Sequence, residues 1–354
     1  QFDSASGHRL SNKTQIKNLY LKSAIFFIPV FIIFYGVNPY GINTIFLYNN
    51  PFGTLATEQW LQESPIQFFL GYFLNIFLGN EQSTFNFVNI IGFIFLYFSL
   101  YSYDSKNLEN VPIIKILYFT PFFLILFYWM GKPDTFTIGS LFLLISYKDR
   151  ITASFVAIFI MIFSHIYVTA IYIFIIILLK LITLRWHHYL SLLINLFFYI
   201  LYRMEIDEIN GRFDVISSEI ERALYSSFTN LLSGIISLFM WIWIPLLLSK
   251  SFKDKKFLLA FVLLMSISFF TLDHTRIFIL SSVPLIIYLS KSRIFNEKFN
   301  LIFSNNWIYL IGLFQIQKRG GGKIVDGWSI LEIDLFKSTL DKFIYFLNNI
   351  VGIF

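Results

Sequence analysis

Long apolar runs constrain this sequence more than any other feature. Residues 153–182 form an almost wholly apolar run of about 30 residues, and about 20 such residues suffice to cross the roughly 30 Å hydrocarbon core of a bilayer. The whole chain is 56% hydrophobic and 14% charged, with a mean hydropathy of +0.68, far from the usual values of soluble domains. We therefore expect an all-α polytopic membrane protein and reject a pair of soluble domains.

The apolar runs predict about 10–12 transmembrane helices in a single domain that covers residues 1–354. The run 153–182 is too long for one crossing, so we divide it at "SHIYVTA", residues 164–170. The C-terminal segment 317–354 contains "KFIYFLNNIVGIF", which is either an interfacial helix or a further span. The expected spans lie near residues 20–36, 86–102, 112–130, 135–147, 153–182, 188–202, 228–248, 257–272, 276–290 and 301–316.

Loop charges orient these spans. With the N-terminus in the cytoplasm, the cytoplasmic loops carry about 17 Lys or Arg against about 6 acids, and the other face, up to Arg276, carries about 5 against about 11. This asymmetry obeys the positive-inside rule, and it would fail if 153–182 crossed only once. The break near His165 thus has support from charge as well as from length, and His165 is expected at the extracytoplasmic apex.

The extracytoplasmic face also receives most of the polar segments. The first external loop, residues 37–85, contains an apolar stretch too short to cross, which predicts a helix lying in the membrane interface. Residues 203–227 form an acidic amphipathic excursion that begins with "RMEIDEINGR". A third external segment, "WMGKPDTF", joins two spans and carries Lys132 and Asp134. Polar chemistry is therefore expected at one face of the molecule.

Composition excludes several classes of function. The chain has no Cys, which excludes disulfides, a thiolate nucleophile and a Cys-based metal site. No phosphate-binding loop of the Walker type and no HExxH spacing occurs, so we favour a function without a metal or other cofactor. The net charge of +6 follows from the basic loops of a membrane protein, so we expect a lipid surface and no nucleic acid as partner. The oligomeric state is open.

The segment "FTLDHTRIF" places Asp273, His274 and Arg276 between two apolar runs. An ionisable residue at membrane depth costs at least about 2.5 kcal/mol, so those that are kept usually face a cavity and have a function. Arg276 is a candidate phosphate ligand, because a guanidinium matches phosphate oxygens bidentately, with Asp273 as base and His274 beside them. The alternative is a solvated helix cap with an exposed Asp273–Arg276 ion pair worth under about 1 kcal/mol.

Asp134 and His165 are the next candidate catalytic groups. Asp134 comes directly before a short span, where it either caps the helix or acts as a general base on a sugar hydroxyl. His165 is either a satisfied core histidine or a base and hydrogen-bond donor at neutral pH. Both readings stay open for each residue at the level of sequence.

The first external loop offers further acids. Glu58 and Glu63 flank Trp60, and Glu63 comes shortly before Pro65. These acids are either surface charges on an interfacial helix or groups placed above the mouth of a cavity. We retain Glu63 as a candidate catalytic residue and Glu58 and Trp60 as candidate substrate-binding residues.

The order of these segments resembles that of a known superfamily. A Pro-containing helix, "ESPIQFFLGYFLNIFLGN", leads into a span, and "GKPDTFTIGSLFLLISYKDR" and "FSHIYVTA" follow, with "HTRIFILSSVPLIIY" near the end. This layout resembles the GT-C superfamily of membrane glycosyltransferases, and within it the Wzy-type O-antigen and exopolysaccharide polymerases. As a pattern the resemblance covers roughly residues 20–290. It implies a GT-C-like fold in the bacterial inner membrane, with an extracytoplasmic active site.

The resemblance also implies a substrate, a polyprenyl-(di)phosphate-linked sugar or oligosaccharide, and roles for the polar residues. Cations would stabilise the leaving phosphate, acids or His165 would accept the proton of the attacking hydroxyl, and Phe-rich helices would hold the lipid. Many GT-C enzymes carry an Asp in the first external loop, where this chain offers only glutamates. The implied catalytic residues are Asp273, Asp134, His165 and Glu63, and the implied substrate-binding residues are Arg276, His274, Lys132, Arg203, Glu58 and Trp60.

Three classes of function remain: a glycosyltransferase, a flippase or transporter, and an acyltransferase, which the scarcity of His on the external face disfavours. The layout favours a polymerase of O-antigen or capsule repeat units, and an enzyme that transfers one sugar from a polyprenyl-phosphate donor is the near alternative. A lipid-linked saccharide flippase or secondary transporter is a different class, since broken spans and buried ionisable groups also mark transport sites. A transporter would carry polar residues in mid-span and inverted repeats, whereas here the polar residues gather at one face.

Overall fold

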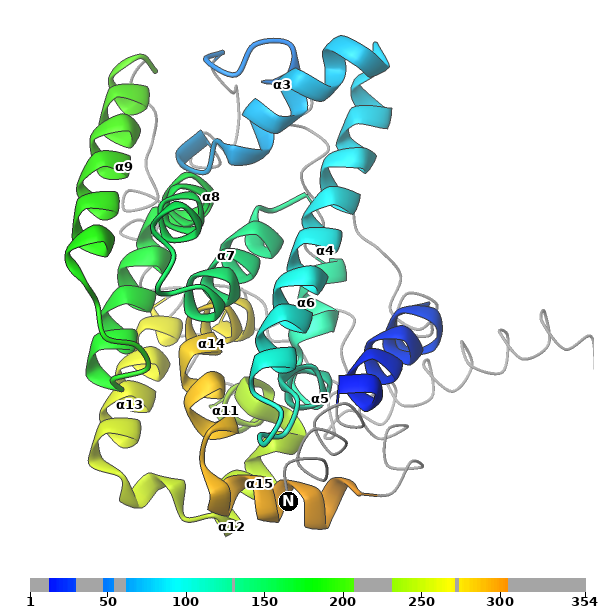
Figure 1. Cartoon of the computed structure of the whole chain (residues 1–354), viewed down its shortest axis with the longest axis vertical. Helices are drawn as coiled ribbons and strands as arrows, with labels where there is room; N and C mark the ends of the chain where they lie inside the picture. The colour runs from blue at the N-terminus through cyan, green and yellow to red at the C-terminus, as the bar shows by residue number, and fades with distance from the viewer. Residues whose placement is uncertain are drawn as a thin grey trace, which may run out of the picture.

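The computed structural model describes residues 13–29, 47–53, 62–128, 131–206, 231–270 and 274–304, and these ranges contain helices and no strand (Figure 1). The all-α prediction is confirmed for this part of the chain. The helices are η1 (Ser23–Phe27), α3 (Ile66–Leu78), α4 (Glu81–Lys106), α5 (Ile113–Tyr118), α6 (Phe122–Tyr128), α7 (Asp134–Ser146), α8 (Ile151–Leu178), α9 (Trp186–Met204), α11 (Leu231–Phe239), η4 (Met240–Ile242), α12 (Trp243–Leu248), η5 (Ser251–Lys253), α13 (Lys255–Phe269), α14 (His274–Ser290) and α15 (Arg293–Phe303).

By length and composition alone, α4 and α8 are the described helices that could cross a membrane, although α8 is divided at His165 into two shorter arms. A third would be the pair α14 and α15, if a span bent by 97° is counted. The chain therefore carries the membrane-spanning type of helix that the apolar runs predict. The total of 10–12 crossings and the GT-C-like fold stay predictions, and the segment 317–354 and most of the excursion 203–227 lie outside the described residues.

The loops that the charge count assigned to one face do lie together. The Arg185 guanidinium is 2.7 Å from a carboxylate oxygen of Asp149, and Lys291 Nζ is 3.4 Å from the carbonyl oxygen of Leu181. In Figure 1 this end of the bundle is at the bottom, where α4 ends and α9 and α13 begin. We call it the basic end and define it by residues 146–150, 180–187, 250–256 and 291–293. The grouping of these loops is confirmed, and their side of the membrane stays a prediction.

Helix α8 folds back on itself at His165, whose backbone (φ −165°, ψ 85°) is not helical. Asp149 precedes α8 and Arg185 follows it, yet the two are in contact at the basic end. A straight helix of 28 residues would hold its ends about 42 Å apart, and the short linker to Arg185 spans only about half of that. The prediction that 153–182 consists of two pieces meeting near His165 is therefore confirmed.

The two arms of α8 pack against different helices. The first arm runs beside α9, where Ser154 Oγ is 3.4 Å from His188 Nε2 and the Phe163 and Tyr199 ring centroids are 5.8 Å apart. The second arm runs beside α14, and the Tyr172 hydroxyl donates to the carbonyl of Leu280 over 2.6 Å. Each arm is about 20 Å long. The apex at His165 is thus reached from the basic end by two short helices.

Helix α7 lies at the centre of the bundle, and nearly all of its side chains are buried (Figure 1). Close packing against α4 depends on two glycines. A Cβ added at Gly92 would lie 2.5 Å from Thr135 Oγ1, and one at Gly139 would lie 2.8 Å from the Phe95 ring. Small residues at helix contacts let backbones approach closely, which is the usual way that membrane helices gain packing energy. This packing fixes the start of α7, and with it Asp134.

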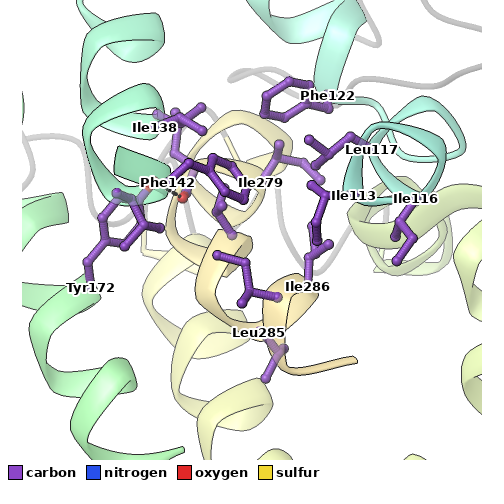
Figure 2. Close-up of a cluster of buried hydrophobic side chains, with 14 of the residues drawn as sticks. Ile113, Ile116, Leu117, Phe122, Ile138, Phe142, Tyr172, Ile279, Leu285 and Ile286 are labelled. Atoms are coloured by element: carbon purple, nitrogen blue, oxygen red, sulfur yellow. Dashed lines mark hydrogen bonds between the residues drawn. The ribbon is translucent and has the colours of Figure 1, made fainter. Parts of the chain in front are cut away.

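The apolar core joins α7 to α14, α8 and α5. Figure 2 shows Ile138 and Phe142 of α7 facing Ile279 of α14, with Tyr172 of α8 beside them and its hydrogen bond drawn as a dashed line. Ile113, Ile116 and Leu117 of α5 and Phe122 of α6 complete this cluster, and all are nearly inaccessible. The core therefore lies between the short helices rather than on the lipid-facing surface.

Two expected spans are interrupted. Residues 112–130, predicted as one span, form α5 and α6 with a break before Pro121, because proline lacks an N–H and clashes with the preceding helical turn. Residues 228–248 are also divided, since Met240 has φ 47° and Pro245 lies in the first turn of α12. The Trp243 indole N–H donates to the carbonyl of Ile235 over 3.0 Å, which satisfies a helical acceptor near the break.

Asp104 joins three segments near the basic end. Its carboxylate accepts from the Tyr20 hydroxyl over 2.7 Å and from the Ile113 backbone N–H over 2.8 Å, so it caps α5 and holds the helix over residues 13–29. Asp104 is 2% exposed. At the other end of the bundle, α3 lies obliquely across the helices (Figure 1), and its 13 residues confirm a helix within the segment 37–85, which the charge count assigns to the first external loop.

Candidate functional site

Asp134 and Arg276 form a buried bidentate ion pair. Arg276 Nε donates to Asp134 Oδ2 over 2.9 Å and its Nη2 donates to Oδ1 over 2.8 Å. The two residues are 2% and 4% exposed. Two parallel charge-assisted hydrogen bonds of this kind are strong and directional, and in a buried setting each partner depends on the other for compensation of its charge. The pair therefore ties the first turn of α7 to the first turn of α14.

This pairing corrects two expectations. The solvated cap with an exposed Asp273–Arg276 ion pair is wrong for Arg276, which is buried and bound to Asp134; Asp273 itself lies outside the described residues. Asp134 does not cap α7 through its side chain, since the N-cap is Pro133 and the carboxylate is directed to Arg276.

The loop before Asp134 is held from α4. Asn89 Oδ1 accepts from the Gly131 backbone N–H over 2.9 Å, and Asn89 Nδ2 donates to the carbonyl of Phe85 over 2.8 Å. Gly131 has φ 97°, a conformation open to glycine and strained for other residues. Lys132, next in the chain, is 4% exposed. The loop thus carries a buried lysine two positions before Asp134.

His165 lies at the apex between two groups of polar residues. Its neighbour Ser164 accepts from Thr137 Oγ1 over 2.8 Å, one helical turn after Asp134. Two residues beyond His165, the Tyr167 hydroxyl is 3.4 Å from Glu63 Oε1. His165 itself is 4% exposed. The apex therefore links the start of α7 to the turn before α3.

Glu63 lies in a setting of tyrosines. The Tyr199 hydroxyl donates to the Glu63 carbonyl over 3.0 Å, and the Tyr202 hydroxyl donates to the Gln62 carbonyl over 3.1 Å. Arg203 Nη2 is 4.0 Å from Glu63 Oε1, at the limit of an ion pair, and its side chain is 30% exposed. Glu63 is 4% exposed, so this acid is buried next to a cation that reaches the surface.

An apolar groove of about 720 Å³ lies next to the chain segment that holds Glu63, since its lining includes Ile66 and Tyr202, and the Tyr202 hydroxyl donates to the carbonyl of Gln62. The groove lies between α3, α8 and α9, and its first-arm residues from α8 are within two turns of His165. Its size is that of a typical small-molecule site, and it is far more apolar than most. The lining residues are Phe52, Ile66, Phe69, Leu70, Phe73, Phe159, Phe163, Phe198, Leu201, Tyr202 and Glu205.

The structure brings together five of the ten predicted site residues, in two groups joined at His165. Asp134 and Arg276 form the first group and Glu63 and Arg203 the second. Lys132 is buried in the loop before α7, and His274 is the first residue of α14, with its side chain outside the described part. Asp273, Glu58 and Trp60 lie outside the described residues. Within the described ranges, no group of three or more potential metal-ligating side chains occurs.

Sequence reasoning missed the tyrosines and Asn89. Tyr199 and Tyr202 are spaced three residues apart, which places them on one face of α9, and this spacing was the available signal. Asn89 is a polar residue in the middle of a predicted span, which marks a helix-to-helix or loop contact. Neither signal shows which residue each of these side chains contacts.

Comparison with family models, with curated proteins and with solved structures finds no match to this chain.

Proposed function

We propose that the protein is a membrane glycosyltransferase that acts on polyprenyl-(di)phosphate-linked saccharides and joins saccharide repeat units into a polymer. The observation that carries the proposal is the aromatic groove, whose lining residues Ile66 and Tyr202 are close in sequence to Glu63 and Arg203. It provides an apolar surface for a lipid chain, and the adjoining chain segments provide a buried acid and a partly exposed cation. A lipid-linked phosphate sugar has those same three parts, namely the chain, the phosphate and the hydroxylated sugar.

Glu63 is the favoured general base. It is buried, and its carboxylate oxygen Oε1 lies 3.4 Å from the Tyr167 hydroxyl and 4.0 Å from the Arg203 guanidinium. The acceptor hydroxyl would attack the anomeric carbon while the bond from that carbon to the phosphate oxygen breaks and its electron pair leaves with the phosphate. The proton of the hydroxyl passes to Glu63.

Arg203 is the favoured ligand of the leaving phosphate. Its guanidinium is at the limit of ion-pair distance from Glu63 and partly exposed, so it can rotate to a phosphate without breaking a short bidentate pair. Arg276, by contrast, donates two short hydrogen bonds to Asp134. We therefore assign this pair the role of holding α7 and α14 together at the site.

Purified protein in liposomes with a polyprenyl-diphosphate-linked oligosaccharide tests the proposal. We expect a ladder of longer lipid-linked glycans, detected by mass spectrometry as additions of whole repeat units. Glu63→Gln should abolish the ladder, and Glu81→Gln, which changes a half-buried acid of the same region that is hydrogen bonded to Asn49, should leave it intact. A single added unit from a polyprenyl-phosphate sugar would indicate the single-sugar transferase, and unchanged substrate with either donor would contradict both enzymes.

A second function has support from one observation. Helix α8 is broken at His165, and Ser164 at this break bonds to Thr137, which lies one turn of α7 after the ion-paired Asp134. Discontinuous helices with ionisable groups also form the substrate sites of secondary transporters. The same liposomes distinguish this flippase or transporter from the enzyme. Transport would move a fluorescent lipid-linked oligosaccharide between leaflets without any change of mass, whereas the enzyme changes its mass.

A further inference from the structure

The basic end contains a small polar pocket that the proposed function does not use. The pocket has a volume of about 260 Å³ and lies between the start of α13 and the corner at which α14 turns into α15. In Figure 1 these segments meet at the bottom of the bundle, where α15 runs across the end of α14. Its lining residues are Ser251, Asp254, Tyr288, Leu289, Lys291 and Ser292.

Lys291 supplies the positive charge of this pocket. Its Nζ makes one long hydrogen bond, 3.4 Å, to the carbonyl of Leu181, although an ammonium has three donors. Burial and the ammonium of Lys148 nearby lower the pKa of Lys291. Within the described chain, no acidic side chain lies within salt-bridge distance of Lys291 or Lys148. An anion in the pocket would relieve the repulsion between these two cations.

The neighbouring acids already have other partners. Asp149 is paired with Arg185 at 2.7 Å, and Glu297 is paired with Arg293 at 2.9 Å. Asp254 lines the pocket, and its carboxylate accepts from the Tyr288 hydroxyl and from two backbone N–H groups at the start of α13. These hydrogen bonds occupy the Asp254 carboxylate and tie it to Tyr288 of α14 and to the first turn of α13.

Ser292 adds a donor to the pocket. Its Oγ accepts from the Phe295 backbone N–H over 3.4 Å, which leaves its hydroxyl hydrogen to donate. An ammonium and a hydroxyl on consecutive residues suit the two non-bridging oxygens of a phosphodiester. The carboxylate of Asp254, which also lines the pocket, suits a hydroxyl group attached to that phosphate.

Helix α15 shows how this corner meets a lipid surface. It is bent by 97° from α14, and its Phe295 and Phe299 are buried against the protein. Ile294 and Leu301 are 58% and 71% exposed on the same helix. An amphipathic helix that lies across the end of a membrane bundle places such residues at the headgroup level.

We propose that the α14–α15 corner binds the headgroup of an anionic phospholipid, with the phosphate on Lys291 and Ser292 and a headgroup hydroxyl on Asp254. The lipid that fits this chemistry is phosphatidylglycerol, which has one phosphodiester and two hydroxyls. Its acyl chains would extend beside the exposed apolar residues of α15. The lining of this pocket shares no residue with that of the apolar groove, so the test of the lipid site does not depend on the glycosyltransferase proposal.

Native mass spectrometry of the full chain, with phosphatidylglycerol and phosphatidylcholine titrated into the same detergent, tests the site. We expect preferential binding of phosphatidylglycerol, weakened about tenfold by Lys291→Gln, the effect of one charge-assisted hydrogen bond. Arg293→Gln is the matched control, because it removes one positive charge from the same end and does not line the pocket. Its affinity for phosphatidylglycerol should stay within about twofold of that of the unaltered protein.

Three results would overturn the site. Equal losses of affinity in the two variants would show that only general surface charge matters. Equal affinity for the two lipids would show that the headgroup is not selected. Equally tight binding of inorganic phosphate would show that the rest of the lipid is not recognised. A photoactivatable phosphatidylglycerol provides a test that needs no variant. It should label residues 288–295 of the unaltered protein, and labelling confined to other segments would contradict the proposal.

Discussion

The buried ion pair between Asp134 and Arg276 makes a quantitative prediction about stability. Asp134→Asn and Arg276→Gln each leave one buried charge without its partner, and breaking a buried pair in this way costs about 3–5 kcal/mol. Changing both residues removes both charges, so the double variant should lose no more than either single one. The expected coupling energy in the double-mutant cycle is therefore about 3 kcal/mol.

An exposed pair of the same chemical type serves as the control. Asp149 and Arg185 are 2.7 Å apart, but both side chains are 57% exposed. Surface pairs of this kind contribute about 0–1 kcal/mol, because water screens them and ordering two side chains opposes the gain. The cycle with Asp149→Asn and Arg185→Gln should thus give a coupling energy below about 1 kcal/mol.

The measurement is the free energy of unfolding of all the variants in mixed micelles, followed by the fluorescence of the tryptophans. The cycle gives a clear refutation. If the effects of Asp134→Asn and Arg276→Gln add to within about 0.5 kcal/mol, the two charges do not depend on each other and the assignment of this pair as the link between α7 and α14 is wrong. The same holds if the buried and exposed cycles give equal coupling energies.

Four further predictions follow from single sites. Gly92→Ala should destabilise the fold by about 1–3 kcal/mol in the same unfolding assay, since the new Cβ meets Thr135 Oγ1 at 2.5 Å, and an unchanged stability would contradict the tight α4–α7 contact. Asp104→Ala should cost about 2 kcal/mol or more through loss of the cap of α5, with protease cutting near Ile113 as a second readout. The hydrogen bond from the Tyr288 hydroxyl lowers the pKa of Asp254 in the folded protein. The stability that Asp254 contributes is therefore complete above the ordinary carboxyl pKa of about 4 and is lost as the pH falls through the lower pKa of the folded state. Thermal unfolding at pH 5 and pH 3 should show this loss of stability, and the loss should be smaller in Tyr288→Phe. Phe163→Ala enlarges the groove and should weaken use of the lipid-linked substrate while soluble sugar analogues are unaffected.

The sequence predicted the features that depend on local pattern. The break at His165 followed from the length of one apolar run and from the charges of the loops around it, and both signals are physical properties of the segment itself. The grouping of the basic loops followed from the same count. Asp134 and Arg276 were each identified as rare ionisable residues beside apolar runs.

The partners of these residues were beyond the reach of sequence. Asp134 and Arg276 are 142 positions apart, and Asp273 offered a nearer acid, so nothing in the pattern selects the pair that forms. The breaks near Pro121 and Met240 have a related cause, because an apolar run has the same composition whether its helix is continuous or divided. Prolines in these runs were the local signal, and packing decided where each break fell.

The fold-back of α8 has a consequence for how this protein can vary. The distance from the basic end to His165 is set by the number of residues in each arm, at 1.5 Å for every residue. Deleting one residue from an arm would also rotate everything beyond it by about 100°, and would turn Ser164 or Tyr167 away from its partner. Changes of three or four residues, made together in both arms, come closest to restoring the original facing. Substitutions can therefore accumulate along the two arms of α8, whereas a change in the length of either arm alone disconnects the start of α7 from the turn before α3.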